Sequence, residues 1–247
     1  MKAKISVIVP TYGRFDSFKK LVKSLDDSSV PKENLELIVV SSDPLDSDKI
    51  QWIKNINTID TQLFCEADRK SVRNRSLYYY ENVGIKNAKY DWILVCNDDM
   101  WFEPDWYEKF IGYLEDSINV YLVSSHIGFG SSLRIPSIGT VTKDGYEDTL
   151  WLFDMTIINR SVYEKVNYLD ENIYWYGKGA DLSLAVKFLT EEKIKLCHDV
   201  KINHDLSHEH RGDNISTTPN GDDFVYIREK WNRWINENNK SYSYVWI

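Results

Sequence analysis

Residues 5–14 have the sequence Ile-Ser-Val-Ile-Val-Pro-Thr-Tyr-Gly-Arg, and this stretch decides the fold. The first five residues form a short β-branched run, which predicts a buried strand, and Pro10 begins the loop that closes it. Residues 15–25 then place apolar side chains at helical spacing, with lysines between them. We expect this segment to be a helix that lays one apolar stripe on a sheet.

The alternation of strand and helix continues along the chain. Such a β-α-β-α order favours a parallel sheet with helices on both faces, and these sheets bind ligands at the carboxyl ends of their strands. The loops after Val9, Val40 and Cys96 should therefore share one rim. Further strands are expected at 35–40, 62–65, 90–96, 150–158 and 194–202, and further helices at 48–55, 71–88, 104–114, 160–166 and 181–189.

Two segments depart from this regular pattern. The helix at 71–88 is expected to break near Gly84, because glycine is a weak helix former. Residues 124–145 hold four glycines among serines and threonines. This composition is too loose for a helix and predicts an active-site flap or an irregular insertion.

Composition limits the possible classes of protein. The 247 residues are 43% hydrophobic and 28% charged, which suits one α/β domain with its own core, and the formal net charge of -8 argues against a nucleic-acid partner. The three cysteines are far apart and predict buried thiols of a reducing compartment. No apolar run reaches membrane-helix length, and the first run is too short for a signal peptide. We expect a cytoplasmic protein without a transmembrane segment, for which peripheral membrane contact remains open.

The expected strand 90–96 ends in Asn97, Asp98 and Asp99. Two adjacent carboxylates at the end of an apolar strand repel each other and lose hydration, so they need a cation, hydrogen bonds or an exposed turn. One interpretation is a binding site for a cation. The other is a polar turn that caps the helix from Pro104, since Asp and Asn are common cap residues.

Taken in order, these motifs resemble the family 2 glycosyltransferases, which use nucleotide sugars and have the GT-A fold. The resemblance rests on residues 5–14 and on residues 82–104, where an Asn, a Gly-Ile pair, an Ala, an apolar strand, an Asp-x-Asp-like motif and a Pro follow at the family's spacing. It implies a three-layer α/β/α sandwich with a mostly parallel central sheet in a domain of residues 1–218. Residues 219–247 are expected to be a C-terminal amphipathic helix and tail packing on that domain.

The resemblance also implies a donor site. Asp99 would bind Mn²⁺ or Mg²⁺ bridging the donor diphosphate, while Asn97 replaces the motif's first acid and Asp98 contacts the donor. A departing nucleoside diphosphate gains negative charge, which a hard cation with oxygen ligands stabilises. Arg14 lies near phosphate or is paired on the surface, and the basic segment 69–75 approaches the donor or forms a solvated helix face. The implied donor-binding residues are Pro10, Thr11, Tyr12, Arg14, Asp43, Arg73, Asn82, Asn97 and Asp98.

The family's general base comes from a Glu-Asp pair at a helix start, but Lys178 and Gly179 hold those places here. Asp181 is then the candidate base, or else an ordinary helix cap, and Asp154 is a second candidate. Among the clustered histidines, His204 and His208 are candidates to complete the metal site. The alternatives are ordinary imidazoles or a separate zinc site.

Aromatic side chains near the expected site suggest an acceptor platform, because aromatic rings stack on the apolar faces of sugars; core packing is the alternative. Trp151 and Trp175 are the candidates for acceptor contact. The C-terminal helix is expected to pack on the domain, with a homo-oligomer contact or a membrane surface as alternatives.

The resemblance implies an enzyme that moves a sugar from a nucleotide-diphosphate donor to a hydroxyl of a glycan, a lipid-linked or a protein acceptor, with inversion at the anomeric carbon. Two alternatives stay open. One is a sugar-1-phosphate nucleotidyltransferase, although the opening loop has only Gly13 where that class shows a glycine-rich loop. The other is a non-catalytic glycan- or nucleotide-binding domain on a degenerate GT-A fold.

Overall fold

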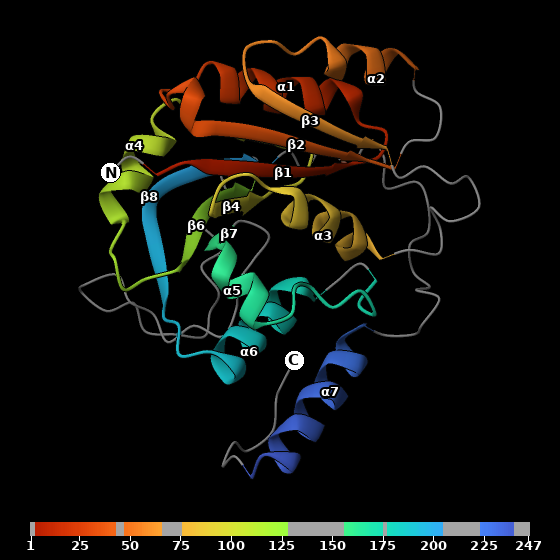
Figure 1. Ribbon diagram of the computed structural model, residues 1–247, viewed down its shortest axis with the longest axis vertical. Coiled ribbons are helices and arrows are strands. Elements are labelled where there is room, and N and C mark those ends of the chain that lie inside the picture. The colour runs from red at the N-terminus through yellow and green to blue at the C-terminus, as the bar shows by residue number, and fades with distance from the viewer. Residues whose placement is uncertain are drawn as a thin grey trace.

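The computed structural model of the protein describes residues 3–42, 47–65, 76–127, 156–174, 177–204 and 223–239. Its centre is a sheet with helices on both faces (Figure 1). The strands are β1 Ile5–Thr11, β2 Leu35–Ser41, β3 Asp60–Cys65, β4 Trp92–Val95, β5 Met100–Phe102, β6 Val120–Ile127, β7 Thr156–Asn159 and β8 Ile194–His204. The helices are α1 Phe15–Asp26, α2 Ser47–Lys54, α3 Leu77–Asn87, α4 Trp106–Tyr113, α5 Arg160–Lys165, α6 Lys178–Leu189 and α7 Asp223–Glu237, with a 3₁₀ turn η1 at Lys32–Asn34.

The strand order is β3-β2-β1-β4-β7-β6-β8-β5. The pairs β2–β3, β1–β2, β1–β4 and β6–β8 are parallel, whereas β4–β7, β6–β7 and β5–β8 are antiparallel. The predicted α/β/α sandwich with a mostly parallel sheet is therefore confirmed. β1, β2 and β4 run in the same direction, so their carboxyl ends meet at one edge, as expected for the loops that follow them.

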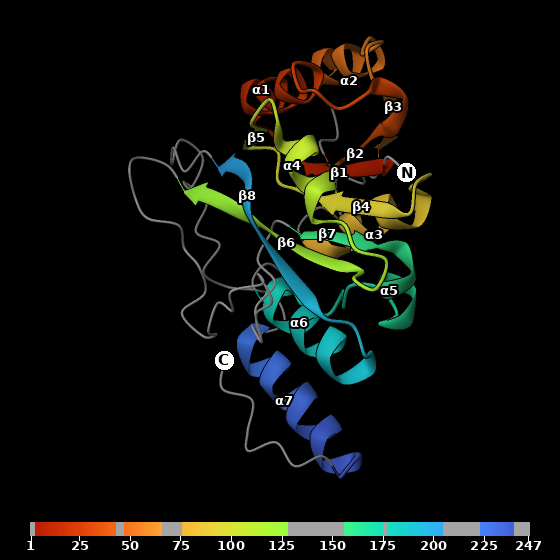
Figure 2. The ribbon, with the colours of Figure 1, turned by 90° about the vertical axis from the view of Figure 1, so that its left-hand side faces the viewer.

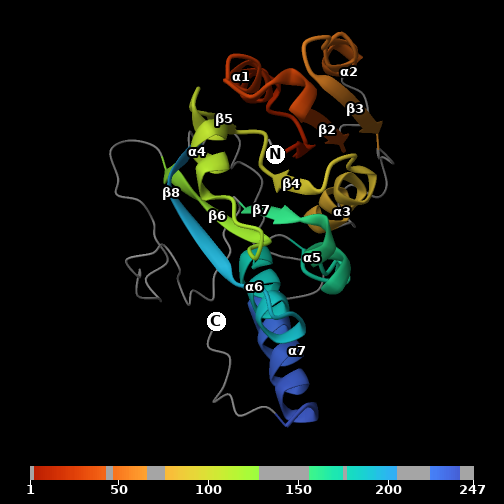
Figure 3. The ribbon, with the colours of Figure 1, turned by 60° about the vertical axis from the view of Figure 1, so that its left-hand side comes forward.

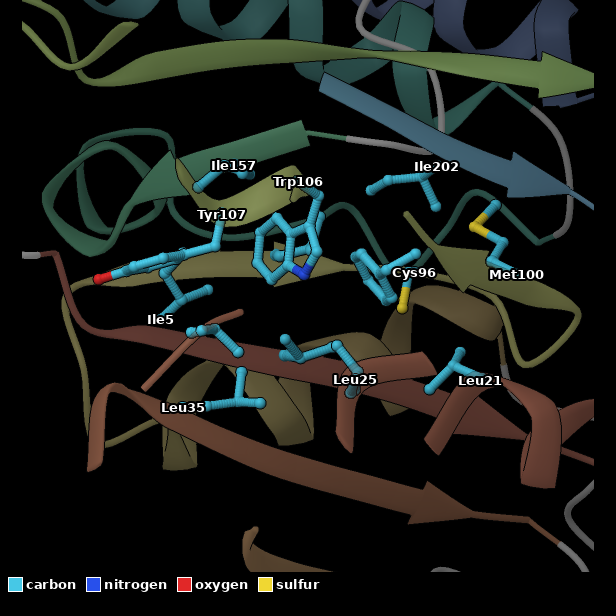
Figure 4. Packing of buried hydrophobic residues seen from close by; sticks show 14 of the residues in the cluster. Ile5, Leu21, Leu25, Leu35, Cys96, Met100, Trp106, Tyr107, Ile157 and Ile202 are labelled. Atoms are coloured by element: carbon cyan, nitrogen blue, oxygen red, sulfur yellow. The ribbon is translucent and has the colours of Figure 1, made fainter. Parts of the chain in front are cut away.

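β1 is the centre of the hydrophobic core because both of its faces are covered. Ile5, Val7 and Val9 pack on the side of α1, α2 and α4, whereas Ile8 packs on the side of α3, α5 and α6. Figure 4 shows Ile5 between Tyr107 of α4 and Leu35 of β2. Burial on both faces explains the continuous apolar run in this strand, in place of the polar–apolar alternation of a half-exposed strand.

The layers are clear when the molecule is turned. α1 and α2 lie on one side of the β1–β3 region and α3 on the other, and the long β8 runs beside β6 toward β5 (Figures 2 and 3). α7 lies along α6 at the far end from α1, and its Ile227 and Trp231 are buried in the same cluster as the core residues of α6. No helix in the described ranges has both the length and the apolar character needed to cross a lipid bilayer.

Several sequence expectations need correction. β5 was not predicted, because three residues are too few to show a pattern. The glycine-rich segment expected from residue 124 begins as strand, since β6 continues to Ile127 beside β8; residues 128–145 lie outside the described ranges. Cys96 and Cys197 are buried as predicted, but Cys65 is exposed, because it ends β3 at the edge of the sheet.

The predicted break near Gly84 is also wrong, since α3 runs through it without interruption. Gly84 is needed for contact between elements: a Cβ built there would lie 2.2 Å from Cγ2 of Ile8, far inside van der Waals contact. The absent side chain therefore lets α3 lie directly on β1. The gain in packing outweighs the low helix propensity of glycine.

We predict that Gly84→Ala destabilises the protein by about 1–3 kcal/mol, because the new methyl group overpacks a rigid, β-branched neighbour. Urea unfolding followed by circular dichroism measures this change. Gly112→Ala is the matched control, because Gly112 also lies in a helix but has no atom within 4 Å of a built Cβ. The control should gain up to about 1 kcal/mol through helix propensity. Equal effects of the two substitutions would contradict the close-approach explanation.

Candidate active site

The register between β1 and β4 brings the opening loop to the acidic motif. Val95 is opposite Ile8, and the N–H of Cys96 donates to the carbonyl of Ile8 at 3.0 Å. Three residues after Ile8 and three after Val95, the hydroxyl of Thr11 donates to Oδ2 of Asp98 at 2.7 Å. Two segments 87 residues apart in sequence thus meet at the carboxyl edge of the sheet.

A buried lysine, Lys49, forms hydrogen bonds with the loop that carries Thr11. Lys49 of α2 has no exposed surface, and its Nζ donates to Oγ1 of Thr11 at 2.8 Å and to the carbonyl of Gly13 at 2.6 Å. The ammonium therefore holds the loop and adds positive charge near Asp98. Lys49 was not among the predicted site residues. Its position was a signal, because it lies one helical turn from the buried Ile53 and so on the apolar face of α2.

Arg14 holds the acidic pair from the other side. Gly13 and Arg14 both have positive φ, at 65° and 39°, a left-handed conformation that is uncommon for arginine. Nη1 of Arg14 forms an ion pair with Oδ2 of Asp99 and lies 3.6 Å from Oδ1 of Asp98. The two turn residues thus direct the guanidinium back over the carboxylates, and 37% of the Arg14 side chain remains exposed.

His204 reaches the same carboxylate from the end of β8. Met100, the first residue of β5, is opposite His204, so Asp99, which precedes it, lies beside the imidazole. Nε2 of His204 is 3.1 Å from Oδ1 of Asp99. This oxygen is buried and accepts no hydrogen bond from the described residues. The predicted neighbours Asp99 and His204 are therefore brought together. The described ranges contain no group of three or more His, Cys, Asp or Glu side chains arranged to hold a metal ion.

Burial controls the charge of Asp98. The pKa of this carboxyl is raised from 3.8 to about 6, mainly because burial removes it from water and to a smaller extent because Asp99 is nearby. The hydrogen bond from Thr11 and the positive charges of Arg14 and Lys49 oppose this increase. The hydrogen bond from Thr11 and the two cations together favour the ionised form of Asp98 in this buried position.

The other predicted donor residues differ in their surroundings. Pro10 is buried in β1, Tyr12 is 60% exposed on the loop, and Asn97 is partly exposed beside the acidic pair. Asn82 is 2% exposed, and its amide bonds the segment after α5: it donates to the carbonyl of Leu169 at 2.9 Å and to Oε1 of Glu171 at 2.8 Å, and accepts from the N–H of Leu169 at 3.0 Å. The structure thus gives Asn82 a role in joining α3 to this segment.

Asp181, the candidate base, lies between α6 and α7. Lys230 donates to its two carboxylate oxygens at 2.8 and 3.0 Å, and the indole N–H of Trp231 donates to Oδ1 at 2.7 Å. Burial raises the pKa of Asp181, against the opposing charge of Lys230. Lys230 also contacts Asp170 at 2.8 Å. The hydrogen bonds that the Asp181 side chain accepts from described residues all come from α7, and no sequence pattern predicted this pairing of Asp181 with Lys230 and Trp231.

The remaining predicted residues lie outside the described ranges. They are Asp43, Arg73, Trp151, Asp154, Trp175 and His208. Their roles stay predictions, as does the boundary between residues 218 and 219.

The chain is similar in sequence to a known family. The sequence model of glycosyl transferase family 2 matches residues 6–170, more than half of the chain, so the chain belongs to this family. A glucosyl-dolichyl phosphate glucuronosyltransferase of Haloferax volcanii is 26% identical over 230 residues, which make up 92% of this chain and 61% of that protein. The match extends well past the acidic motif.

Two solved structures share the fold. The S. aureus TarS 1–349 structure in complex with UDP has a TM-score of 0.67 at 17% identity and covers 91% of this chain and 63% of that one. The mannosyltransferase PcManGT from Pyrobaculum calidifontis, in complex with GDP-Man and Mn²⁺, has a TM-score of 0.62 at 13% identity and covers 86% of this chain and 59% of that one. The chain spans less than two thirds of the length of each of these three proteins. The architecture is the GT-A fold of nucleotide-sugar glycosyltransferases.

We predict that Asp98 makes stability depend on pH. Its pKa is higher in the folded than in the unfolded state, so protonated Asp98 contributes stability that is present below pH 3.8 and is lost as the pH rises through 6. With a chelator present, the free energy of unfolding should fall between pH 4 and 7 by about 2 kcal/mol more in the wild type than in Asp98→Asn. Asp116→Asn, at an exposed position, should follow the wild type. Superimposable profiles for the wild type and Asp98→Asn would refute the assignment.

We also predict that Lys230→Gln destabilises the protein by about 1–3 kcal/mol, because the substitution removes the cation shared by two largely buried carboxylates. Chemical unfolding measures the change. Arg228→Gln, at an exposed position on the same helix, removes the same charge and should alter stability by less than about 0.5 kcal/mol. If both variants behave alike, Lys230 does not anchor α7.

Proposed function

We propose that this protein transfers a sugar from a nucleoside-diphosphate donor to a hydroxyl of an acceptor, with Mn²⁺ or Mg²⁺ and with inversion at the anomeric carbon. The observation that carries the proposal is the group at the carboxyl edge of β1 and β4. There, the carboxylates of Asp98 and Asp99 meet the guanidinium of Arg14 and the imidazole of His204. Oxygen and nitrogen ligands for a cation thus lie beside a positive group suited to phosphate.

The residues present fit a divalent cation. Oδ1 of Asp99 is a buried acceptor without a hydrogen bond from the described residues, and the neighbouring imidazole nitrogen is at a distance typical of two ligands on one ion. Asp99 and His204 would hold the metal, and the donor's phosphates and water would complete its oxygen-rich coordination. When bound, the metal would supply a Lewis acid for the departing diphosphate.

The chain's own residues would bind and orient the donor. Tyr12 offers an exposed ring beside the site, which is suited to stacking on a nucleobase, and Arg14 offers a planar fork of N–H donors for phosphate. Lys49 and Thr11 would keep the loop in the shape that presents both groups. Asp98, held by Thr11, would accept hydrogen bonds from donor hydroxyls.

Transfer forms a bond from the acceptor oxygen to the anomeric carbon and breaks the bond from that carbon to the diphosphate oxygen. The acceptor proton must pass to a base on the acceptor side. Asp154 is the candidate that fits this need, because Asp181 already accepts hydrogen bonds from Lys230 and Trp231. Trp151 and Trp175 stay the candidates for contact with the acceptor.

The relatives guide the choice of ligands. One solved neighbour is named for its complex with UDP, another for its complex with GDP-Man, and the Haloferax relative is named for transfer onto glucosyl-dolichyl phosphate. A first panel should therefore contain uridine and guanosine diphosphates and their sugars. The acceptor panel should include lipid-linked glycosides, free glycans and protein hydroxyls.

A non-catalytic nucleotide-binding domain is the second candidate. It is favoured by the replacement of the family's Glu-Asp pair by Lys178 and Gly179, and by the engagement of Asp181 with α7. Such a domain would bind the donor without releasing the nucleoside diphosphate.

The test is thermal unfolding against the nucleotide panel, with Mn²⁺ or with a chelator. A ligand at 100 times its Kd stabilises the folded state by about 2.7 kcal/mol, which is a readily measured shift. We expect one nucleotide to stabilise the wild type in a metal-dependent manner and to lose that effect in Asp99→Asn. Asp116→Asn, which changes an exposed acid between α4 and β6, should keep the full shift.

Release of the nucleoside diphosphate from the stabilising nucleotide sugar, measured with the acceptor panel, then separates the two candidates. Turnover abolished by Asp154→Asn supports the transferase. Donor binding without release in any condition supports the binding-only domain. If no nucleotide shifts the unfolding temperature, both the transferase and the binding-only domain are ruled out.

A further inference from the structure

Arg14 stands where a cation for the acidic motif is needed. Its guanidinium lies on Oδ2 of Asp99 and within 3.6 Å of Oδ1 of Asp98, so it contacts both carboxylates at once. Oδ1 of Asp99, beside His204, is the oxygen that remains without a hydrogen bond from the described residues. Arg14 thus occupies one oxygen of Asp99, and the other oxygen is available to a second cation.

Two cations of the described residues lie near the two carboxylates. Asp98 and Asp99 contribute two negative charges, and Arg14 and Lys49 contribute two positive charges. Asn97 adds none, although it holds the first position of the motif. A divalent ion that enters this group alone is repelled by the guanidinium on the carboxylate it must share.

The two cations differ in their freedom to move. Lys49 is fully buried and is held by Thr11 and Gly13. More than a third of the Arg14 side chain is exposed, and its ion pairs are made by the terminal nitrogen of a long side chain. Arg14 can therefore leave the carboxylates without unfolding its surroundings, whereas Lys49 cannot.

We propose that Arg14 is a resident counter-cation of Asp98 and Asp99, which moves onto the donor's diphosphate and yields Asp99 to the metal only when the donor arrives. The inference rests on the proposed function and concerns the order in which its ligands are accepted. The diphosphate offers the guanidinium another anion, whose oxygens accept two parallel hydrogen bonds from it. Metal and nucleotide consequently bind as a pair, while the metal alone binds weakly.

Mn²⁺ binding to the full chain, measured by loss of the free-ion electron paramagnetic resonance signal, tests this proposal without any turnover. Arg14→Met should bind Mn²⁺ alone about tenfold more tightly than the wild type, because the competing cation is gone. The same substitution should weaken the binding of the nucleoside diphosphate in chelator. These opposite signs distinguish an exchange of partners from general damage to the site.

Two variants provide the controls. Lys20→Met removes one positive charge from an exposed position on α1 and should leave both affinities unchanged. Arg14→Lys keeps a cation and should bind Mn²⁺ alone as weakly as the wild type. If Arg14→Met does not fold, Arg14→Gly repeats the test, because glycine accepts the left-handed backbone at that position.

The outcomes separate this inference from the function on which it depends. Nucleotide-dependent Mn²⁺ binding in the wild type, with tighter binding of the metal alone in Arg14→Met, supports the exchange. Equal affinity of the wild type and Arg14→Met for Mn²⁺ alone overturns it and leaves the metal-dependent transferase intact. Failure of every variant to bind Mn²⁺, even with nucleotide, overturns the metal requirement and the exchange together.

Discussion

Two adjacent carboxylates at the end of a buried strand impose the main constraint on this molecule. Asp98 and Asp99 lose most of their water at the carboxyl edge of β4, and the charged form of such groups is costly without compensation. Thr11, Arg14 and Lys49 supply that compensation from β1, its loop and α2. The fold brings these separate elements together through the β1–β4 register, so the electrostatics of the site depend on the packing of the central strand.

Sequence predicts well those parts of the fold in which the apolar pattern of a single segment shows which of its faces are buried. β1, β2 and β4 are apolar runs because both faces are buried, and α1 has a clear apolar stripe. The parts that sequence missed depend on a partner. β5 is recognisable only through its pairing with β8, and the helix expected to break at Gly84 continues because Ile8 of β1 needs the space.

The same distinction applies to the site. The acidic motif and the opening loop were predicted from their own residues and from family spacing, and the structure brings them into contact. The proximity of His204 to Asp99 was expected only by resemblance; its physical origin is an antiparallel pairing of β5 with β8 that no local pattern shows. Asp181 illustrates the opposite case, since an acid at a helix start looks the same whether it faces a substrate or, as here, Lys230 and Trp231 of another helix.

The placement of the three thiols has a practical consequence. Burial raises the pKa of Cys96 and Cys197, so both are poorly reactive, whereas Cys65 is exposed at the end of β3. Thr11, Ser41 and Cys65 are opposite one another in neighbouring parallel strands, which puts Cys65 about 10 Å from Thr11. A maleimide dye should thus attach selectively at Cys65 in the natural chain. The label would lie close enough to the loop of Arg14 to report its movement by fluorescence, with no engineered cysteine.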